Sequence, residues 1–396
     1  MRIAYFSDNF YPEISGISDS ILTTGEELRR RGHDIMYAAP WYPRRTYKKT
    51  RDAARDKLPA LRLPSFHYPG SPTGQSRIAI PFGYSIPAMK RFRPDVIHAQ
   101  SPHGAGLEAF FAARALGVPL VGTEHTPVEE FARYAPIPGF ARAWLAWERW
   151  YYNRCAFVTT PYQGLYDDMR HRGLRAPGRG ESNPVPFVSS MFSDEERHAC
   201  KTQFGVKGPL VLCSGRLAPE KRVDDVIRAF ALAQKEVPHA TLVITGHGTS
   251  EPGLKKLARQ LDVERHVRFA GFVNFETLGR LYCTAEAYII MSTAETQSLS
   301  LMQAYASGTP AVCADSHGLH DYTPQDCGFL VAPGDVQGAA QKLLTLFKDD
   351  ALRARMGEAG AEFVKKFAPD KIAAQWEEIY NSVLNAKANA PPSRRA

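Results

Sequence analysis

The chain has 396 residues, 44% of them hydrophobic, and a net charge of +8. It is long enough to bury two cores of ordinary size, and it has no apolar run long enough to cross a bilayer, which excludes a spanning helix. Met1-Arg2 leads directly into a predicted strand, so we expect no signal peptide. Six cysteines without a Cys-x-x-Cys pair indicate buried free thiols in a reducing cytoplasm.

Predicted strands and helices alternate through the first half of the chain. Strands are expected at 2–7, 33–39, 95–100, 120–124 and 157–161, with helices between them. This alternation is typical of a parallel, doubly wound sheet. The proline-broken stretch 183–186 that follows shows no periodicity, and it predicts a hinge that extends to about Gly208.

The same alternation returns in the second half of the chain. Strands are expected from Leu210 and at 241–246, 267–271, 287–292 and 310–314, and an amphipathic segment covers 369–387. We therefore predict an α/β protein with two doubly wound, Rossmann-like parallel-sheet domains that face a cleft. The domains are placed at 1–190 and 191–368, with a C-terminal helix at 369–388 and a disordered tail at 389–396.

One informative turn runs from Gly215 to Arg222 and follows the apolar strand that begins at Leu210. Apolar residues after the turn repeat at helical spacing, so Arg216 and Lys221 flank a predicted strand-to-helix turn. A helix N-terminus presents unpaired N–H groups and a positive dipole end, and an arginine can bind two anion oxygens at once. The turn therefore predicts a diphosphate site. The alternative is a solvated, charged helix start.

A second turn of this kind follows the strand predicted at 287–292. It comprises Glu295, Thr296, Gln297, Ser298 and Leu299. Both turns lie at the carboxyl ends of predicted parallel strands, where α/β sheets bind ligands. The run 246–248, Gly-His-Gly, follows another strand of the same domain, but it is a weaker motif because two glycines close many loops.

Together the two turns resemble those of a retaining glycosyltransferase of the GT-B fold, family 4. That family carries a glycine-arginine-leucine turn followed by glutamate-lysine, and then a Glu-x7-Glu element. Similar segments occur along nearly the whole chain, at 1–16, 94–98, 123–126 and 246–248. The runs 14–16 and 295–297 are similar to those of diacylglycerol glucosyltransferases and other glycolipid synthases of the family.

The resemblance implies a role for each matching residue. Arg216 and Lys221 would hold the donor diphosphate, and Glu295 would contact the hydroxyls of the donor sugar. Gln303 stands where the family has the second glutamate, which holds the nucleotide ribose, and it can still form hydrogen bonds without a charge. The other expected donor-binding residues are Gly215, Gly246, Gly248, Thr296, Gln297, Ser298 and Leu299.

In the first domain the resemblance points to Gly16 and His125. Gly16 lies in a predicted strand-to-helix turn, where the absence of a Cβ lets backbone amides approach a phosphate. His125 follows a predicted strand, and in the family this histidine contacts the donor sugar. His98 is interpreted as a core residue and His103 as an acceptor-side candidate. The family's C-terminal helix crosses back onto this domain.

We expect neither a cofactor nor a metal. The sequence contains no Asp-x-Asp and no His, Cys or carboxylate cluster with ligand spacing. A departing diphosphate needs its negative charge stabilised, and Arg216 and Lys221 would do this in place of a metal ion. In the mechanism that the family favours, the leaving phosphate takes the acceptor proton. A short-lived covalent intermediate is the alternative.

The positive charge is concentrated in one segment. Residues 44–93 contain twelve lysines and arginines against two aspartates, a net +10. Arg44, Arg45, Lys48 and Lys49 are the candidates for contact with an anionic membrane, which attracts basic residues by about 1 kcal/mol each. An ordinary solvated loop is the alternative. Nucleic acid is disfavoured as a partner because the segment lacks interleaved stacking aromatics within a recognised module.

An aromatic stripe lies between the basic segment and the predicted hinge. Phe140, Trp144, Trp147 and Tyr151 repeat at helical spacing. Such a stripe more often belongs to a core. Alternatively, Trp144 and Trp147 line a groove for a lipid or sugar acceptor.

These features predict a cytoplasmic hexosyltransferase, peripherally bound to the inner face of the membrane. Its donor would be a nucleotide diphosphate sugar such as UDP-glucose, and its acceptor a lipid such as diacylglycerol. One alternative is a transferase that acts on a soluble or polyprenyl-linked saccharide. Another is a GT-B protein that binds nucleotide or glycan without turnover, because the family pattern is broken at Gln303, Ser298, Arg222 and 183–186.

Overall fold

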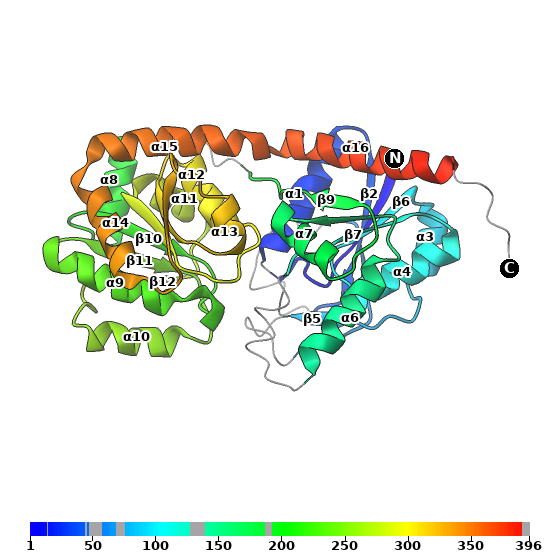
Figure 1. The fold of residues 1–396 in the computed structure, drawn as a ribbon, viewed down its shortest axis with the longest axis horizontal. Coiled ribbons are helices and arrows are strands. Elements are labelled where there is room, and N and C mark those ends of the chain that lie inside the picture. The colour runs from blue at the N-terminus through cyan, green and yellow to red at the C-terminus, as the bar shows by residue number, and fades with distance from the viewer. Residues whose placement is uncertain are drawn as a thin grey trace. The chain divides into compact units, whose positions relative to one another are not determined.

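The computed structural model describes residues 1–13, 15–43, 46, 58–68, 76–126, 139–186 and 192–389. The chain forms two compact units (Figure 1). Unit 1 comprises Met1–Pro184 and Pro369–Ala396, and unit 2 comprises Val185–Ala368. The division after Pro184 falls within the proline-broken stretch at 183–186.

Unit 1 is built on a seven-stranded sheet with the order β3-β2-β1-β6-β7-β8-β9. Neighbouring strands run parallel throughout this sheet. The chain order reverses between β1 and β6, which makes the gap between their carboxyl ends a topological switch point. The strands are β1 (Arg2–Phe6), β2 (Asp34–Pro40), β3 (Ala60–Leu63), β6 (Val96–Ala99), β7 (Leu120–Thr123), β8 (Phe157–Thr160) and β9 (Gly178–Gly180).

Helices and a small hairpin surround this sheet. Ser15 begins the first helix because its side-chain oxygen accepts a hydrogen bond from the Ser18 amide at 3.1 Å. Gly117 ends another helix in the left-handed conformation, at φ +64°. The elements are α1 (Gly16–Arg30), α3 (Ile86–Phe92), α4 (Gly104–Leu116), α6 (Phe140–Tyr152), α7 (Gln163–His171) and the antiparallel strands β4 (Ser65–His67) and β5 (Arg77–Ala79).

Unit 2 contains a six-stranded sheet with the order β12-β11-β10-β13-β14-β15, again with parallel neighbours. Its switch point lies between β10 and β13. The central strands are mostly apolar and buried because both faces of the sheet are covered. The strands are β10 (Leu210–Ser214), β11 (Thr241–Thr245), β12 (Val267–Gly271), β13 (Ala287–Ile290), β14 (Ala311–Ala314) and β15 (Gly328–Val331).

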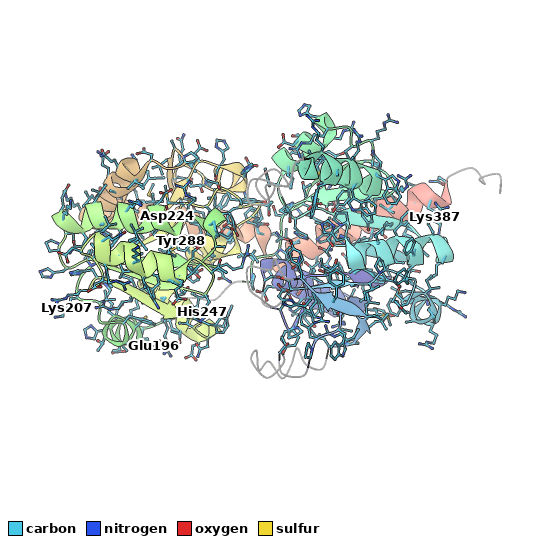
Figure 2. The ribbon with its side chains drawn as sticks, turned by 90° about the horizontal axis from the view of Figure 1, so that it is seen from below. Glu196, Lys207, Asp224, His247, Tyr288 and Lys387 are labelled. Atoms are coloured by element: carbon cyan, nitrogen blue, oxygen red, sulfur yellow. The ribbon has the colours of Figure 1, made fainter. Side chains whose placement is uncertain are left out.

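The helices of unit 2 pack their apolar stripes on this sheet. On α9, Val223, Val226, Ile227 and Phe230 are buried at the helical spacing seen in the sequence. Tyr288, on β13, lies inside the unit, whereas His247 lies at its surface (Figure 2). The helices are α8 (Asp194–Gln203), α9 (Val223–Glu236), α10 (Glu251–Gln260), α11 (Phe275–Thr284), α12 (Leu299–Ala306), α13 (His317–Asp321), α14 (Val336–Lys348) and α15 (Asp350–Val364), with 3₁₀ turns η2 (Pro219–Lys221) and η3 (Lys365–Phe367).

The last helix, α16 (Pro369–Ala388), packs against α1 of unit 1 (Figure 1). Its Glu377 carboxylate pairs with Arg31 and His33, at 2.6 Å to each. Near its end, Lys387 donates to the Gly117 carbonyl at 2.6 Å. These contacts attach the end of the chain to the first unit.

The predicted fold class is confirmed, since both sheets are parallel and Rossmann-like. The sequence did not predict β3, β9 or β15, all of which lie at sheet edges. The turn after β10 also differs from the prediction. Its residues Pro219–Lys221 form the 3₁₀ turn, and the α-helix begins only at Val223.

All six cysteines lie in the described part of the chain, and each is a buried free thiol, as predicted. Within the described ranges, none of the helices combines the length and the apolar character needed to cross a membrane.

Candidate active site

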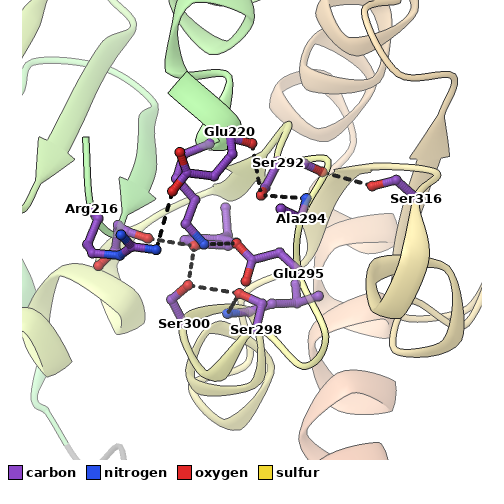
Figure 3. Close-up of polar contacts among 12 residues, drawn as sticks. Arg216, Glu220, Ser292, Ala294, Glu295, Ser298, Ser300 and Ser316 are labelled. Atoms are coloured by element: carbon purple, nitrogen blue, oxygen red, sulfur yellow. Dashed lines mark hydrogen bonds and ion pairs between the residues drawn. The ribbon is translucent and has the colours of Figure 1, made fainter. Parts of the chain in front are cut away.

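The predicted donor-binding residues Arg216, Lys221 and Glu295 lie at the switch point of unit 2. Strands β10 and β13 are neighbours, and their carboxyl ends lead into Gly215 and into the loop that carries Glu295. Figure 3 shows the polar contacts around Arg216 and Glu295, in which Arg216 pairs with Glu220 and Glu295 pairs with Lys221. The edge of the sheet that binds ligands in doubly wound folds therefore carries this group.

Lys221 and Glu295 form an ion pair across the two turns. The Lys221 ammonium lies 2.6 Å from Glu295 Oε1. The two side chains are 19% and 12% exposed. Charge-assisted hydrogen bonds at this depth are stronger than those at a surface. The pair holds the ends of two strands together, and it places a cation next to the proposed sugar-binding carboxylate.

Arg216 has a partner that the sequence reading missed. Its guanidinium lies 3.3 Å from Glu220 Oε1, whose side chain is only 8% exposed, while Arg216 itself is 36% exposed. The spacing of four residues was visible in the sequence, but the 3₁₀ turn that brings the two together was not predicted. Each cation of the turn thus faces a carboxylate, and Arg216 still reaches solvent.

Backbone contacts tie the two turns together. The Glu220 carbonyl accepts from the Ser292 hydroxyl at 3.3 Å and from the Thr293 amide at 3.2 Å. Ser316 in turn donates to the Ser292 carbonyl at 2.8 Å. The loops that carry Lys221 and Glu295 are therefore fixed to each other independently of their ion pair.

A buried tyrosine adds a second connection. The Tyr288 hydroxyl donates to the Ser214 carbonyl at 3.1 Å and lies 2.8 Å from Ser300 Oγ. Ser300 contacts Ser298, which caps α12 by accepting from the Leu301 amide at 3.3 Å (Figure 3). Ser298, where the family pattern is broken, thus has a structural role as the N-cap of α12.

The glycines of the 246–248 run let two loops approach closely. A Cβ on Gly246 would lie 2.0 Å from the Gly215 carbonyl oxygen, and a Cβ on Gly248 would lie 2.1 Å from that of Leu217. Leu217 also donates to the His247 carbonyl at 2.9 Å. Larger residues would therefore displace the turn that carries Arg216.

The other donor-binding candidates of unit 2 surround the same α12 terminus. Gln297 and Ser298 are buried, while Thr296, Leu299 and Gln303 are half-buried. Gln303 lies on the second turn of α12, and its carbonyl accepts from the Ser307 amide at 3.1 Å. Thr296, Gln297, Ser298 and Leu299 therefore lie at the N-terminal end of α12, and Gln303 lies one turn further along the helix.

In unit 1, Gly16 is the exposed first residue of α1. His125 is buried after β7, and its Nε2 lies 2.8 Å from Gln100 Oε1. His98 is fully buried, which confirms its interpretation as a core residue. His103 is half-buried and packs edge-on against Trp144, with the ring centroids 4.5 Å apart.

The aromatic stripe of α6 divides between core and surface. Tyr151 is fully buried, while Trp144 and Trp147 are half-buried. Trp147 donates to the Pro102 carbonyl at 3.1 Å and stacks on Trp150. The core interpretation therefore holds for Tyr151 alone among these three. The side chain of Phe140 and the basic residues Arg44, Arg45, Lys48 and Lys49 lie outside the described residues.

A metal site is not evident in the described part of the chain, where no three His, Cys, Asp or Glu side chains are grouped suitably.

Acid is expected to destabilise unit 1 through His125. Burial lowers the pKa of His125 to about 4, below the value of about 6.5 expected in the unfolded chain. As the pH falls, His125 therefore takes up a proton in the unfolded chain before it does so in the folded one. The stability that neutral His125 provides is complete above pH 6.5 and is lost as the pH falls toward 4. At pH 5 the loss is about 2 kcal/mol. Urea unfolding at pH 7.5 and pH 5 measures it.

The variant His125→Gln isolates this effect, because glutamine can still donate to Gln100. Its loss of stability between pH 7.5 and pH 5 should be smaller than that of the wild type by about 2 kcal/mol. Burial raises the pKa of Asp8 to about 6 and the pKa values of Glu124 and Glu181 to about 7, which acts in the opposite direction. Burial also lowers the pKa of His103 to about 4, which acts in the same direction as His125. These contributions cancel in the comparison of the variant with the wild type. Exposed His239→Gln is the control. Identical pH dependence in His125→Gln and the wild type would contradict the expectation.

The chain has two parallel-sheet, Rossmann-like units, and one of them carries two cations, Arg216 and Lys221, at its switch point. These are the features of the GT-B class of nucleotide-sugar transferases. Two family models match the chain, "Glycosyl transferases group 1" at residues 194–363 and "Glycosyltransferase Family 4" at 14–179. A GDP-mannose-dependent alpha-mannosyltransferase of Mycolicibacterium smegmatis is 30% identical over 85% of both chains. The chain therefore belongs to the GT-B glycosyltransferases of family 4, and it is an enzyme that uses a nucleotide sugar.

Other similar proteins differ in their substrates. An alpha-monoglucosyldiacylglycerol synthase of Acholeplasma laidlawii is 26% identical over 79% of this chain and 80% of its own length. Among solved structures, Anabaena HepE in complex with UDP-glucose has a TM-score of 0.78 at 19% identity, covering 96% of this chain and 100% of its own. Sucrose-phosphate synthase from Thermosynechococcus elongatus has a TM-score of 0.79 at 18% identity, covering 98% and 100%. The likeness to these two structures supports the assignment of the GT-B fold.

Proposed function

We propose that the protein transfers a hexose, with retention of anomeric configuration, from UDP-glucose or a related donor to a lipid such as diacylglycerol. The observation that carries the proposal is the group formed by Arg216, Lys221 and Glu295 at the switch point of unit 2. It combines two cations suited to a diphosphate with a carboxylate suited to sugar hydroxyls.

Leaving-group stabilisation is the chemical task of this group. When a diphosphate leaves the anomeric carbon, its oxygens gain negative charge, which preorganised cations stabilise without a cost of reorganisation. Arg216 and Lys221 would do this while Glu295 orients the sugar. In unit 1, His125 would contact the sugar and Gly16 would let backbone amides approach the donor. We propose that no divalent cation is needed, so that EDTA leaves the rate unchanged.

Features of unit 1 support an acceptor at a membrane surface. Several aromatic side chains are exposed on and beside the β4–β5 hairpin, among them Phe66 and Phe82, the latter 77% exposed. Arg77 lies over the ring of exposed Trp41, 5.6 Å from its centroid. Exposed aromatics next to cations suit the headgroup region of anionic lipids. The relatives named for glucosyldiacylglycerol synthesis favour the same acceptor.

Attachment to anionic vesicles is expected to be electrostatic and reversible. It should weaken as salt rises from 0.1 M to 1 M, because the Debye length falls from about 10 Å to about 3 Å. Replacing Arg44, Arg45, Lys48 and Lys49 by glutamine should lower partitioning by up to about 1000-fold, at about 1 kcal/mol per cation. Vesicle sedimentation measures this.

A control variant removes four exposed cations from unit 2, at Lys255, Lys256, Arg259 and Arg265. It should sediment with acidic vesicles like the wild type. If both variants lose binding equally, the net charge and not the 44–93 segment is responsible. If the wild type stays in the supernatant at low salt, the membrane part of the proposal is wrong.

A transferase acting on a soluble or polyprenyl-linked saccharide is the second candidate. The mannosyltransferase that is 30% identical favours a different donor, GDP-mannose. Mass spectrometry after incubation with UDP- and GDP-sugars, a lipid extract and soluble saccharides separates these candidates. We expect a glycosylated lipid from a UDP-sugar. A product formed only on a soluble saccharide would support the second candidate, and no product from any pair would support the non-catalytic alternative.

A further inference from the structure

A chain of buried polar side chains leads from His125 to the C-terminal helix within unit 1. His125 Nε2 lies 2.8 Å from Gln100 Oε1, and Gln100 Nε2 lies 3.0 Å from His98 Nε2. His98 Nδ1 lies 2.8 Å from the hydroxyl of Tyr380, on α16, which in turn lies 2.8 Å from the Tyr5 hydroxyl. These five side chains are all buried.

The hydrogen bonds of this chain share one direction. Burial lowers the pKa of His125 and of His98, so both rings are neutral at pH 7 and each carries one ring proton. His125 donates to the Gln100 carbonyl oxygen, and the Gln100 amide donates to His98 Nε2. The Thr123 hydroxyl lies 2.7 Å from the same Nε2. With the Gln100 amide donating to Nε2, that nitrogen is the acceptor, and His98 donates through Nδ1 to Tyr380. The tautomer of His125 thus depends on Gln100, and that of His98 on Gln100, Thr123 and Tyr380 together.

The His125 ring borders a small cavity. This cavity in unit 1, with room for about one water molecule, is lined by His125, Gln100, His98, Tyr5 and Trp376 among others. Such a space leaves room for the ring to shift if Gln100 moves. The hydrogen bond to Gln100 therefore contributes more to the orientation of His125 than it would if the ring were packed on all sides.

Tyr380 is the fixed end of the chain. It is fully buried, and its helix is held to unit 1 by the Glu377 contacts with Arg31 and His33. The Trp376 ring, one helical turn earlier, lies against the His98 imidazole with the centroids 4.6 Å apart. The C-terminal helix thus determines the position of His98 by both packing and hydrogen bonding.

We propose that Tyr380 is a positioning residue for His125, which it orients through His98 and Gln100. This inference rests on the proposed contact of His125 with the donor sugar. It gives the C-terminal helix a function beyond packing, because docking of α16 completes the orientation of a side chain in the active site. Misorientation of such a side chain lowers the rate of the chemical step more than it lowers nucleotide affinity.

The test is a double-mutant cycle of Tyr380→Phe with His125→Ala. Tyr380→Phe should lower kcat about 10-fold in the wild-type background, with donor KM nearly unchanged. In the His125→Ala background it should change kcat by less than about 2-fold, since nothing is left to orient. Tyr166→Phe is the matched control, because that buried hydroxyl donates to the Ala176 carbonyl at 3.3 Å, outside the chain.

Nitrogen-15 NMR of the histidine rings gives a readout independent of activity. His125 should show one tautomer, with the proton on Nε2, in the wild type and in Tyr166→Phe, and a mixture in Tyr380→Phe. Gln100→Met, which breaks the chain next to His125, should reproduce both the tautomer mixture and the kcat loss. If Tyr380→Phe fails to fold, Gln100→Met tests the same inference.

Equal kcat losses in both backgrounds would show that Tyr380 acts only on the fold, and a wild-type kcat in Tyr380→Phe would show that it does not act at all. Either result overturns the inference and leaves the proposed function standing. Full activity in His125→Ala would instead remove the proposed sugar contact, and the positioning role with it.

Discussion

Replacing Arg216 or Lys221 by alanine is expected to lower kcat by about 10²–10³, the usual loss when one preorganised donor to a developing anion is removed. Both residues lie in the turn after β10, where the leaving diphosphate is proposed to bind. The fold should survive, because neither side chain belongs to the apolar core. Steady-state rates with the identified donor, together with thermal melting, measure the effect.

The two variants should differ in one respect. Lys221→Ala leaves Glu295 without the ammonium that lies 2.6 Å from it, whereas Arg216→Ala leaves Glu220 in a turn still fixed by backbone contacts. We therefore expect the Lys221 variant to lose sugar positioning as well. Exposed Arg228→Ala, on α9 of the same unit, is the control. Rates near wild type in both folded variants would overturn the assignment of the diphosphate site.

Glu295→Gln is expected to lower kcat about 10- to 100-fold while nucleoside diphosphate affinity changes little. Glutamine keeps an oxygen for the Lys221 ammonium but loses the charge, and a hydrogen bond to a charged group contributes about 1.5–3 kcal/mol. The proposed contact is to the sugar, so the loss should appear in turnover. Calorimetric titration with UDP and GDP, compared with the rates, separates sugar from nucleotide effects.

Glu276→Gln provides the matched control, because that carboxylate also pairs with a basic side chain, Arg280, at 2.6 Å but lies on the surface of α11. It should retain both rate and affinity. If Glu295→Gln lowers nucleotide affinity as much as it lowers kcat, then Glu295 contacts the nucleotide and not the sugar.

The parallel strands near the centre of each sheet could be predicted from the sequence because burial on both faces makes them continuous apolar runs. Residues 3–6 of β1 and 210–213 of β10 are of this kind, whereas β6 includes the buried His98. Strands β9 and β15 were missed because an edge strand is short and only partly covered. Strand β9, for example, is Gly-Arg-Gly and has no apolar side chain at all.

The position of the candidate site could be predicted from the sequence, but the contacts between its residues could not. Position after a strand identified the turns of Lys221 and Glu295, because the carboxyl ends of parallel strands share one edge of a sheet. The partners of these residues depend on long-range contacts that no local pattern encodes. Tyr288 reads as one apolar residue of a strand, yet its hydroxyl links Ser214 to Ser300. Likewise, nothing in the sequence connects Tyr380 with His98.

The central claim is that Arg216 and Lys221 of unit 2 hold the diphosphate of the donor. A crystal structure of the chain with UDP or GDP tests it most directly. We predict that the diphosphate lies at the carboxyl ends of β10 and β13, with its oxygens within hydrogen-bond distance of the Arg216 guanidinium and the Lys221 ammonium. A diphosphate bound elsewhere, with both cations still paired only to Glu220 and Glu295, would contradict the claim.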